Sequence, residues 1–490
     1  MSILIASLIF VGILLYLYLN QKKGVSELPA WALPAMYTLK VGAGLIFLQF
    51  YIYSESHPEL VNDAGAFLNE GKILNEVFYE NPSAYFKFLS GIGESRELIE
   101  AHMMETHHWS NESKTLVNNH QNIIRVQSVI HFFSFGEPII HLLVFCLVSL
   151  FGIYYAYLAL RKWSNWHPTM TFVILCSVPS LLFWSSGLLK ESFLLLGIGW
   201  LLYGFSLSRQ NWKKGAFILA GTLLVICFKS YILIGILGGL FAYAIYMLLP
   251  RYRVLSATGI ILLMIFLFFG LFPDTSGKLV YTITRKQYDF HNTGQGGLHV
   301  RDGDYNYYFP TELLHAVEID EDSVKLIQPA DAWRLKRKSV LPMEAVHLEP
   351  SGKRWNIEFL NPKSNTFIPL NPIHGNPLNL VRNVPEALIN TLLRPLPGDP
   401  GGKLNYLVFF ETLFIFGFLL YSIWKRKPLS LQHNAIIFGM TTCIISIALI
   451  IGWVTPVIGA IVRYRIPIHL ALLMIALILL APQRGTASRF

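Results

Sequence analysis

Apolar runs alternate with short polar turns along most of the chain, and two long polar stretches interrupt this pattern. A helix needs about 20 apolar residues to cross the roughly 30 Å hydrocarbon core of a bilayer. Apolar runs suited to this occur at 3–20, 36–53, 132–160, 168–187, 191–207, 215–229, 231–249, 254–272, 404–424, 434–454 and 466–481. We therefore expect an all-α polytopic membrane protein with about eleven transmembrane helices.

The first polar stretch, 54–130, follows a first pair of transmembrane helices in 1–53 and predicts a helical loop. Apolar residues recur in it with helical spacing, at Phe67, Ile73, Leu74, Val77 and Phe78. Helices with one apolar face can lie along a membrane surface. We expect this loop to consist of such surface helices.

The second polar stretch, 273–403, separates a transmembrane core at 131–272 from the C-terminal transmembrane helices at 404–490. Within it, 286–370 contains alternating apolar and polar residues, and Ser351-Gly352 is a turn signal. This composition predicts a small β-rich insertion.

Composition agrees with a membrane protein, because 53% of the residues are hydrophobic and only 14% are charged. The formal net charge of +9 lies largely in short basic clusters between apolar runs, so membrane lipids and no nucleic acid are the expected partners. The four cysteines all fall inside apolar runs, which argues against a disulfide framework or a zinc site. The first apolar run lacks a basic start and a cleavage site, and we expect it to be a retained helix.

Basic residues predict the orientation in the membrane. They cluster at Lys22-Lys23, Arg161-Lys162, Arg209 with Lys213-Lys214, Arg251 with Arg253, Lys425-Arg426-Lys427, and Arg484 with Arg489. All six clusters are cytoplasmic at once only if the N-terminus is outside and the C-terminus is cytoplasmic. Both long loops are then non-cytoplasmic. The cytoplasmic loops are short and lack a GxxxxGK[ST] or GxGxxG stretch in a strand–helix context, so a cytosolic nucleotide or nucleotide-sugar is not the expected direct substrate.

Asp63 is the leading candidate for chemistry, because it follows the second transmembrane helix and lies at the predicted boundary between lipid and water. A carboxylate there can meet a membrane-borne substrate. The simpler interpretation is that Asn62 or Asp63 caps the start of a helix.

Ionisable residues at the ends of transmembrane helices are further candidates, since they are expensive in a membrane and often functional. On the predicted outer side they are Lys190, Glu191, Lys229, Arg394, Arg463 and Arg465. Lysine and arginine near the bilayer surface suit a phosphate or pyrophosphate anchored in lipid. Snorkelling of the long side chains to the headgroups is the competing explanation, and Glu191 can serve simply as an ion-pair partner of Lys190 or Lys229.

The histidines of the first loop suggest a metal site only weakly. His107 and His108 follow Glu105, but adjacent histidines on a helix point about 100° apart. No HExxH spacing is present. No metal ligand is therefore assigned, and a divalent metal requirement stays open.

Together these stretches resemble GT-C fold glycosyltransferases that use lipid-linked sugars. The resemblance rests on Asp63 at the start of the first outer loop and on Arg463-Tyr464-Arg465-Ile466-Pro467 at a late helix. The stretches 183–191 and Arg394-Pro395-Leu396-Pro397, with Glu411, look like parts of membrane proteins of bacterial polysaccharide biosynthesis.

The resemblance implies a transferase in the bacterial cytoplasmic (inner) membrane. Its donor is a polyprenyl-phosphate-linked sugar, used on the non-cytoplasmic face, and its acceptor is a glycan, lipid or protein. Asp63 matches the family's first-loop acidic residue, which takes the proton of the acceptor hydroxyl or orients it. The cationic residues stabilise the leaving phosphate. They are Lys190, Lys229, Arg463 and Arg465, with Arg394, and Glu191, Glu70, Glu411 and Tyr464 support them.

The chain departs from the family in one respect. Many members carry a second acidic residue close to the first, whereas Asp63 is flanked by Asn62 and Ala64. Glu59 or Glu70 can substitute for it, and the residues alone do not assign either.

Two other functions remain open. An O-antigen-type polymerase or ligase shares the large outer loop and the outer arginines but acts on pyrophosphate-linked oligosaccharides, and depends less on Asp63. A transporter or a non-catalytic scaffold is the alternative outside enzymes. A transporter predicts inverted repeats and charges near the bilayer midplane, and neither is evident in the sequence.

Overall fold

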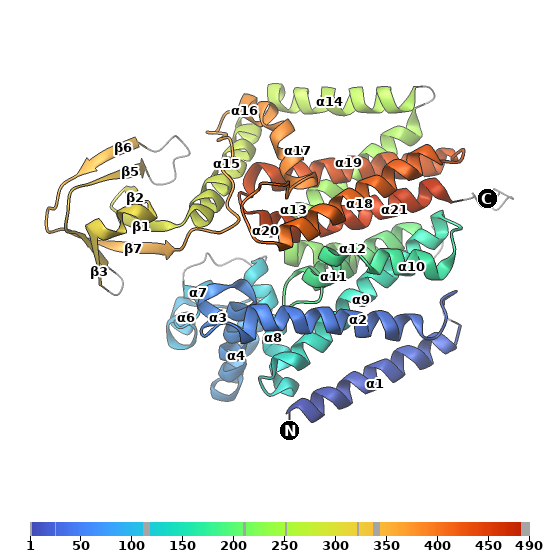
Figure 1. The fold of residues 1–490 in the computed structure, drawn as a ribbon, viewed down its shortest axis with the longest axis horizontal. Coiled ribbons are helices and arrows are strands. Elements are labelled where there is room, and N and C mark those ends of the chain that lie inside the picture. The colour runs from blue at the N-terminus through green and yellow to red at the C-terminus, as the bar shows by residue number, and fades with distance from the viewer. Residues whose placement is uncertain are drawn as a thin grey trace. The chain divides into compact units, whose positions relative to one another are not determined.

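The computed structural model describes residues 2–24, 26–110, 118–208, 212–249, 252–320, 323–336 and 344–481. The chain, drawn as a ribbon in Figure 1, divides into two compact units. Unit 1 comprises residues 1–240, 415–440 and 466–490, and unit 2 comprises residues 241–414 and 441–465. Each unit is described by itself.

The described chain is that of a mainly helical, membrane-embedded protein. Seven of its described helices are long and apolar enough to cross a bilayer: α1 (Ser2–Lys22), α2 (Ala32–Leu48) continued by a π-helical turn η1 (Gln49–Tyr53), α9 (Pro138–Trp163), α13 (Lys213–Leu248), α14 (Arg253–Leu271), α18 (Leu404–Trp424) and α19 (Leu431–Val454). A bent pair, α20 (Ile458–Tyr464) and α21 (Ile466–Leu480), makes an eighth span if it is counted as one.

Three differences separate this count from the predicted eleven. The segment 168–187 forms two short helices, α10 (Pro168–Cys176) and α11 (Pro179–Trp184), because Pro179 starts a new helix. The segment 191–207 forms α12 (Glu191–Ser206), which at 16 residues is shorter than the seven spans. The segments 215–229 and 231–249 are counted together as α13, which joins two helices across a kink at Lys229, where the two predicted segments meet. The third predicted helix also begins later, at Pro138.

Unit 1 is held together by close helix crossings. A Cβ atom placed on Gly199 of α12 would lie 2.1 Å from the carbonyl oxygen of Gly152 on α9. Only glycine allows the two backbones to approach this closely, as small residues do at membrane helix interfaces.

The first polar loop is helical, as predicted. It contains α3 (Pro58–Val61), α4 (Asp63–Glu80), α5 (Pro82–Ser90), α6 (Arg96–His102), α7 (His107–Ser110) and α8 (Asn119–Ser134). The apolar residues with helical spacing lie on α4, and Phe67, Leu74 and Val77 are buried there. Pro82 occupies the first turn of α5, where its missing N–H is not needed.

Three of the predicted basic clusters gather at one end of unit 1, here called the basic end. Arg161 forms an ion pair with Glu27, close in sequence to Lys22-Lys23. The carbonyl oxygen of Trp163 lies 2.9 Å from His433 Nε2. The amide of Lys427 donates to the carbonyl of Leu479 near the end of α21. Of the other clusters, Lys213-Lys214 starts α13 and Arg253 starts α14, while Arg209, Arg251, Arg484 and Arg489 lie outside the described residues.

Unit 2 contains the predicted β-rich insertion. A seven-stranded antiparallel sheet has the order β3-β4-β7-β1-β2-β5-β6. Its strands are β1 (Gly297–Asp302), β2 (Tyr305–Phe309), β3 (Val317–Asp320), β4 (Ser323–Leu326), β5 (Ala330–Lys336), β6 (Glu344–Leu348) and β7 (Arg354–Asn361), and a 3-10 helix η2 (Thr311–Ala316) precedes β3. The predicted range began too early, because residues 286–295 belong to helix α15 (Pro273–Gln295).

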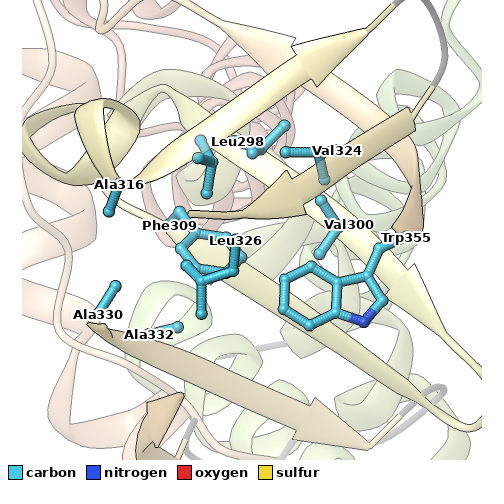
Figure 2. Packing of buried hydrophobic residues seen from close by; sticks show 10 residues of the cluster. Leu298, Val300, Phe309, Ala316, Val324, Leu326, Ala330, Ala332 and Trp355 are labelled. Carbon is cyan, nitrogen blue, oxygen red and sulfur yellow. The ribbon is translucent and has the colours of Figure 1, made fainter. Parts of the chain in front are cut away.

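The sheet has its own hydrophobic core (Figure 2). Alternate residues of the strands point inward, as in Ala330 and Ala332 of β5, and pack with residues such as Phe309 and Trp355. A tight turn joins β1 to β2, and Gly303 takes the left-handed conformation that such a hairpin requires. After the sheet, α16 (Pro377–Arg382) and α17 (Val384–Leu392) lead to α18.

Candidate active site

The chain continues from the second transmembrane helix through α3 into α4, and Asp63 is the first residue of α4. The side-chain oxygen of Asn62 accepts the amide of Gly65 at 3.0 Å, so Asn62 is the N-cap. Asp63 is exposed. Helical spacing places Asp63, Phe67 and Glu70 on one face of α4, at positions i, i+4 and i+7.

This face of α4 meets Lys190, which directly precedes α12. The ammonium of Lys190 lies 5.0 Å from the centre of the Phe67 ring. Lys190 also donates to the side-chain oxygen of Asn119 at 3.3 Å, at the start of α8. The structure therefore brings Lys190 into contact with the first-loop helices α4 and α8.

Glu191 and Lys229 lie beside this contact. Lys229 Nζ is 2.7 Å from Glu191 Oε1, and the two side chains are only 5% and 1% exposed. The predicted ion-pair role of Glu191 is thus observed, with Lys229 as its partner. Just before Lys229, the carbonyl of Cys227 accepts the side-chain amide of Asn122 on α8. We call this end of unit 1, formed by α3–α8, the turn 185–190 and the break at Lys229, the loop end.

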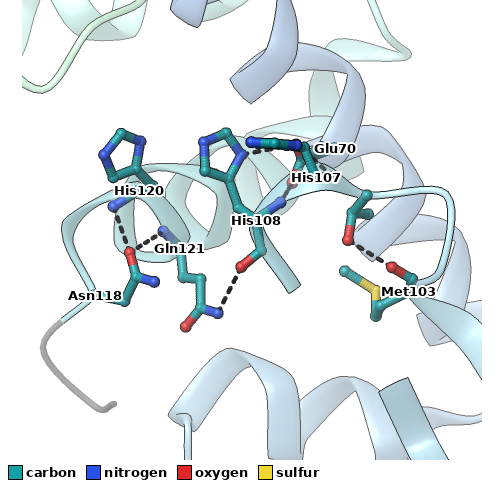
Figure 3. A network of polar contacts seen from close by, with 8 residues as sticks. Glu70, Met103, His107, His108, Asn118, His120 and Gln121 are labelled. Atoms are coloured by element: carbon teal, nitrogen blue, oxygen red, sulfur yellow. Dashed lines mark hydrogen bonds and ion pairs between the residues drawn. The ribbon is translucent and has the colours of Figure 1, made fainter. Parts of the chain in front are cut away.

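Glu70 is buried and binds helix α7 (Figure 3). Its Oε1 atom lies 2.7 Å from Nδ1 of His108. The backbone amides of His107 and His108 donate to the same carboxylate at 3.2 and 3.4 Å. Glu59 and Glu70 were the two candidates for a second acidic residue. Of these, Glu70 is the one whose carboxylate is buried and held in place by hydrogen bonds. Glu59 pairs with His57 at a more exposed position.

His108 is also held from α8. Its ring stacks on that of His120 with the centres 4.7 Å apart and the planes 20° apart. Gln121 donates to the backbone carbonyl of His108 at 2.9 Å. The Phe67 ring lies 5.6 Å from the His108 ring, so the imidazole and Lys190 share a neighbour.

One more buried ion pair supports the first loop. Arg125 Nη2 lies 2.9 Å from Glu94, and the guanidinium also donates to the carbonyl of Phe88 at 2.7 Å. Burial lowers the pKa of Arg125, and the negative charge of Glu94 opposes that shift. The pair fixes α8 against the segment after α5.

Two features of the loop end were missed by sequence reasoning. The Glu70–His108 pair was overlooked because the histidines were considered only as metal ligands. Lys40, the one charged residue in the apolar run 36–53, is fully buried and donates to Ser185 Oγ at 2.7 Å. A lone charge inside an apolar run is a signal that could have found it.

The remaining predicted site residues belong to unit 2. Arg465 is fully buried and donates to the carbonyl oxygens of Thr391 (3.3 Å) and Arg394 and to the hydroxyl of Thr412 (2.9 Å). These carbonyls lie at the C-terminal end of α17, where backbone acceptors lack helical partners. Arg465 therefore caps α17.

The other unit 2 candidates differ in their surroundings. Arg394 donates to Asp399 at 2.7 Å. The guanidinium of Arg463 lies 5.7 Å from the centre of the Tyr464 ring. Glu411 is buried in α18 next to Thr412. Phosphate binding by these residues stays a prediction.

The residues that the structure describes contain no group of three or more His, Cys, Asp or Glu side chains placed to hold a metal ion. Comparisons with protein-family models, curated proteins and solved structures gave no match for this chain. Function is therefore inferred from the site itself.

Proposed function

We propose that this protein is a glycosyltransferase of the GT-C kind, which transfers a sugar from a polyprenyl-phosphate donor on the non-cytoplasmic face of the bacterial cytoplasmic membrane. The observation that carries the proposal is the α4 face, on which Asp63, Phe67 and Glu70 lie in a row and Phe67 contacts Lys190. This face carries two carboxylates, and the ammonium group of a lysine contacts it.

The distribution of charge supports the proposed location of the site on the non-cytoplasmic side of the membrane. Basic residues collect at the basic end of unit 1, and such clusters are cytoplasmic in most membrane proteins. The helices α2 and α9 run between this end and the loop end. The loop end then faces the non-cytoplasmic side, with the N-terminus outside.

The chemistry requires two functions that the loop end offers. The bond between the sugar C1 and the phosphate oxygen breaks, a bond from C1 to the acceptor oxygen forms, and the acceptor loses its hydroxyl proton. A carboxylate at the α4 face orients the acceptor or takes that proton. Lysine ammonium groups offset the negative charge that develops on the leaving polyprenyl phosphate.

The donor class can be tested with the purified full-length protein in liposomes. The panel contains polyprenyl-phosphate sugars, undecaprenyl-pyrophosphate oligosaccharides and nucleotide-sugars. Release of the corresponding leaving group, which is the lipid phosphate, the lipid pyrophosphate or the nucleotide, is measured for each donor. We expect turnover of a polyprenyl-phosphate sugar alone. Turnover of only the pyrophosphate-linked donors would replace the proposal with a polymerase or ligase. Binding without turnover of any donor would favour a transporter or scaffold.

A further inference from the structure

The Glu70–His108 pair has the arrangement of an oriented base. A carboxylate only accepts hydrogen bonds, and Glu70 receives the backbone amides of His107 and His108. The His108 nitrogen that faces it at 2.7 Å, Nδ1, must then carry the hydrogen. In the neutral ring this leaves Nε2 without a proton and able to accept one.

We infer that His108 is the general base of the transfer reaction, with Glu70 as its positioning residue; this rests on the proposed function. Nε2 of His108 takes the proton from the acceptor hydroxyl as its oxygen bonds to the sugar C1 and the C1–phosphate bond breaks. The electron pair of that bond leaves with the polyprenyl phosphate. Asp63, one turn before Phe67 on α4, then orients the acceptor.

The surroundings of the ring fit this role. The His108 side chain is 9% exposed and that of Glu70 is 5% exposed, so the pair is largely shielded from water. Charged interactions are stronger in such surroundings. Gln121 fixes the His108 backbone, and Phe67 and His120 cover the ring. A fixed imidazole is what general base catalysis needs.

The titratable groups around His108 come from three elements. They are Glu70 on α4, His107 on its own helix with the ring centre 5.3 Å away, and His120 on α8, while Lys190 lies across Phe67. Glu70 favours the protonated imidazole once the proton is transferred, and His120 and Lys190 disfavour it when charged.

The alternative is that the pair only fastens α7 to α4, and the variant His108→Asn separates the two roles. Asparagine keeps an N–H that can donate to Glu70 but removes the basic Nε2. His57→Asn is the control, because it makes the same change at an exposed histidine of the first loop, whose side chain pairs with Glu59. Both proteins are compared with wild type by thermal unfolding and by kcat against pH.

Wild-type transfer should fall as the pH is lowered through the range in which histidine titrates. We expect His108→Asn to unfold within a few degrees of wild type, to lose about 100-fold or more in kcat, and to lose this acidic limb. His57→Asn should retain the wild-type kcat and the acidic limb. If His108→Asn kept both the wild-type kcat and the acidic limb, the inference would be overturned, while the proposed transfer reaction would be unaffected. Absence of wild-type transfer from every polyprenyl-phosphate donor would overturn the proposed function together with it.

Discussion

Lys229 and Glu191 form an ion pair inside unit 1, with Nζ and Oε1 2.7 Å apart and both side chains almost fully buried. Removing one partner leaves the other charge buried without compensation, which costs about 3–5 kcal/mol. We expect Glu191→Gln and Lys229→Met each to lower the unfolding temperature strongly. The double variant should be more stable than the sum of the two effects predicts. Additive losses in this double-mutant cycle would show that the two residues are not coupled.

Two neighbouring residues at the start of α4 have different expected roles: Asn62 stabilises the fold, and Asp63 takes part in the reaction. Asn62→Ala removes the N-cap hydrogen bond that Asn62 accepts from the amide of Gly65, and the hydrogen bond that it donates to the carbonyl of Tyr51. This change should destabilise the protein by about 1 kcal/mol or more. Asp63→Asn should change the unfolding temperature less, because the Asp63 side chain is exposed and asparagine keeps its shape. Thermal unfolding in detergent checks both. An equal or larger loss in Asp63→Asn would assign Asp63 a structural role.

Gly199 tests the packing of α12 on α9. Gly199→Ala puts a methyl group 2.1 Å from the carbonyl oxygen of Gly152, so the helices must separate. We expect a lower unfolding temperature and an aggregated fraction in size-exclusion chromatography. Gly12→Ala on α1 is the control, since nothing lies within 4 Å of its added methyl group. Similar behaviour of the two variants would contradict the close crossing.

The stability of the sheet in unit 2 should depend on pH through His299. Burial lowers the pKa of His299 to about 3, from an ordinary value near 6.5. Between these values the unfolded chain binds a proton that the folded chain does not, so stability falls as the pH decreases from about 6.5 towards 3. Comparing the unfolding of wild type and His299→Asn at pH 7 and pH 5 tests this. The variant should lose less stability between the two pH values, and an unchanged difference would exclude His299 as the cause.

Local patterns predicted much of the fold. Apolar run length identified the membrane helices, and helical spacing with the Asn62-Asp63 start identified α4, because both depend on residues close in sequence. The β-rich insertion was also predicted, from the alternation of apolar and polar residues. Counting spans was less accurate, since Pro179 divides one run into two short helices and the run at 191–207 forms a helix of 16 residues. The break between the runs on either side of Lys229 was predicted correctly, because two helices meet there across a kink.

The site depended on contacts that no local pattern contains. Glu70 and His108 are 38 residues apart and Lys40 and Ser185 are 145 apart, so only the fold brings them together. Sequence reasoning identified Lys190, Glu191 and Lys229 because charges at the ends of apolar runs are conspicuous. It could not distinguish an arginine that caps a helix, such as Arg465, from one that is open to a phosphate.

The most direct test of the account is transfer from a polyprenyl-phosphate sugar by three forms of the full-length protein: wild type, Asp63→Asn and Glu76→Gln. Glu76 lies on the same helix, is 58% exposed and pairs only with Lys72 among the ion pairs of the described chain. We predict that Asp63→Asn loses about 100-fold or more in kcat while folded, and that Glu76→Gln stays close to wild type. Wild-type kcat in Asp63→Asn would contradict the proposed site on the α4 face.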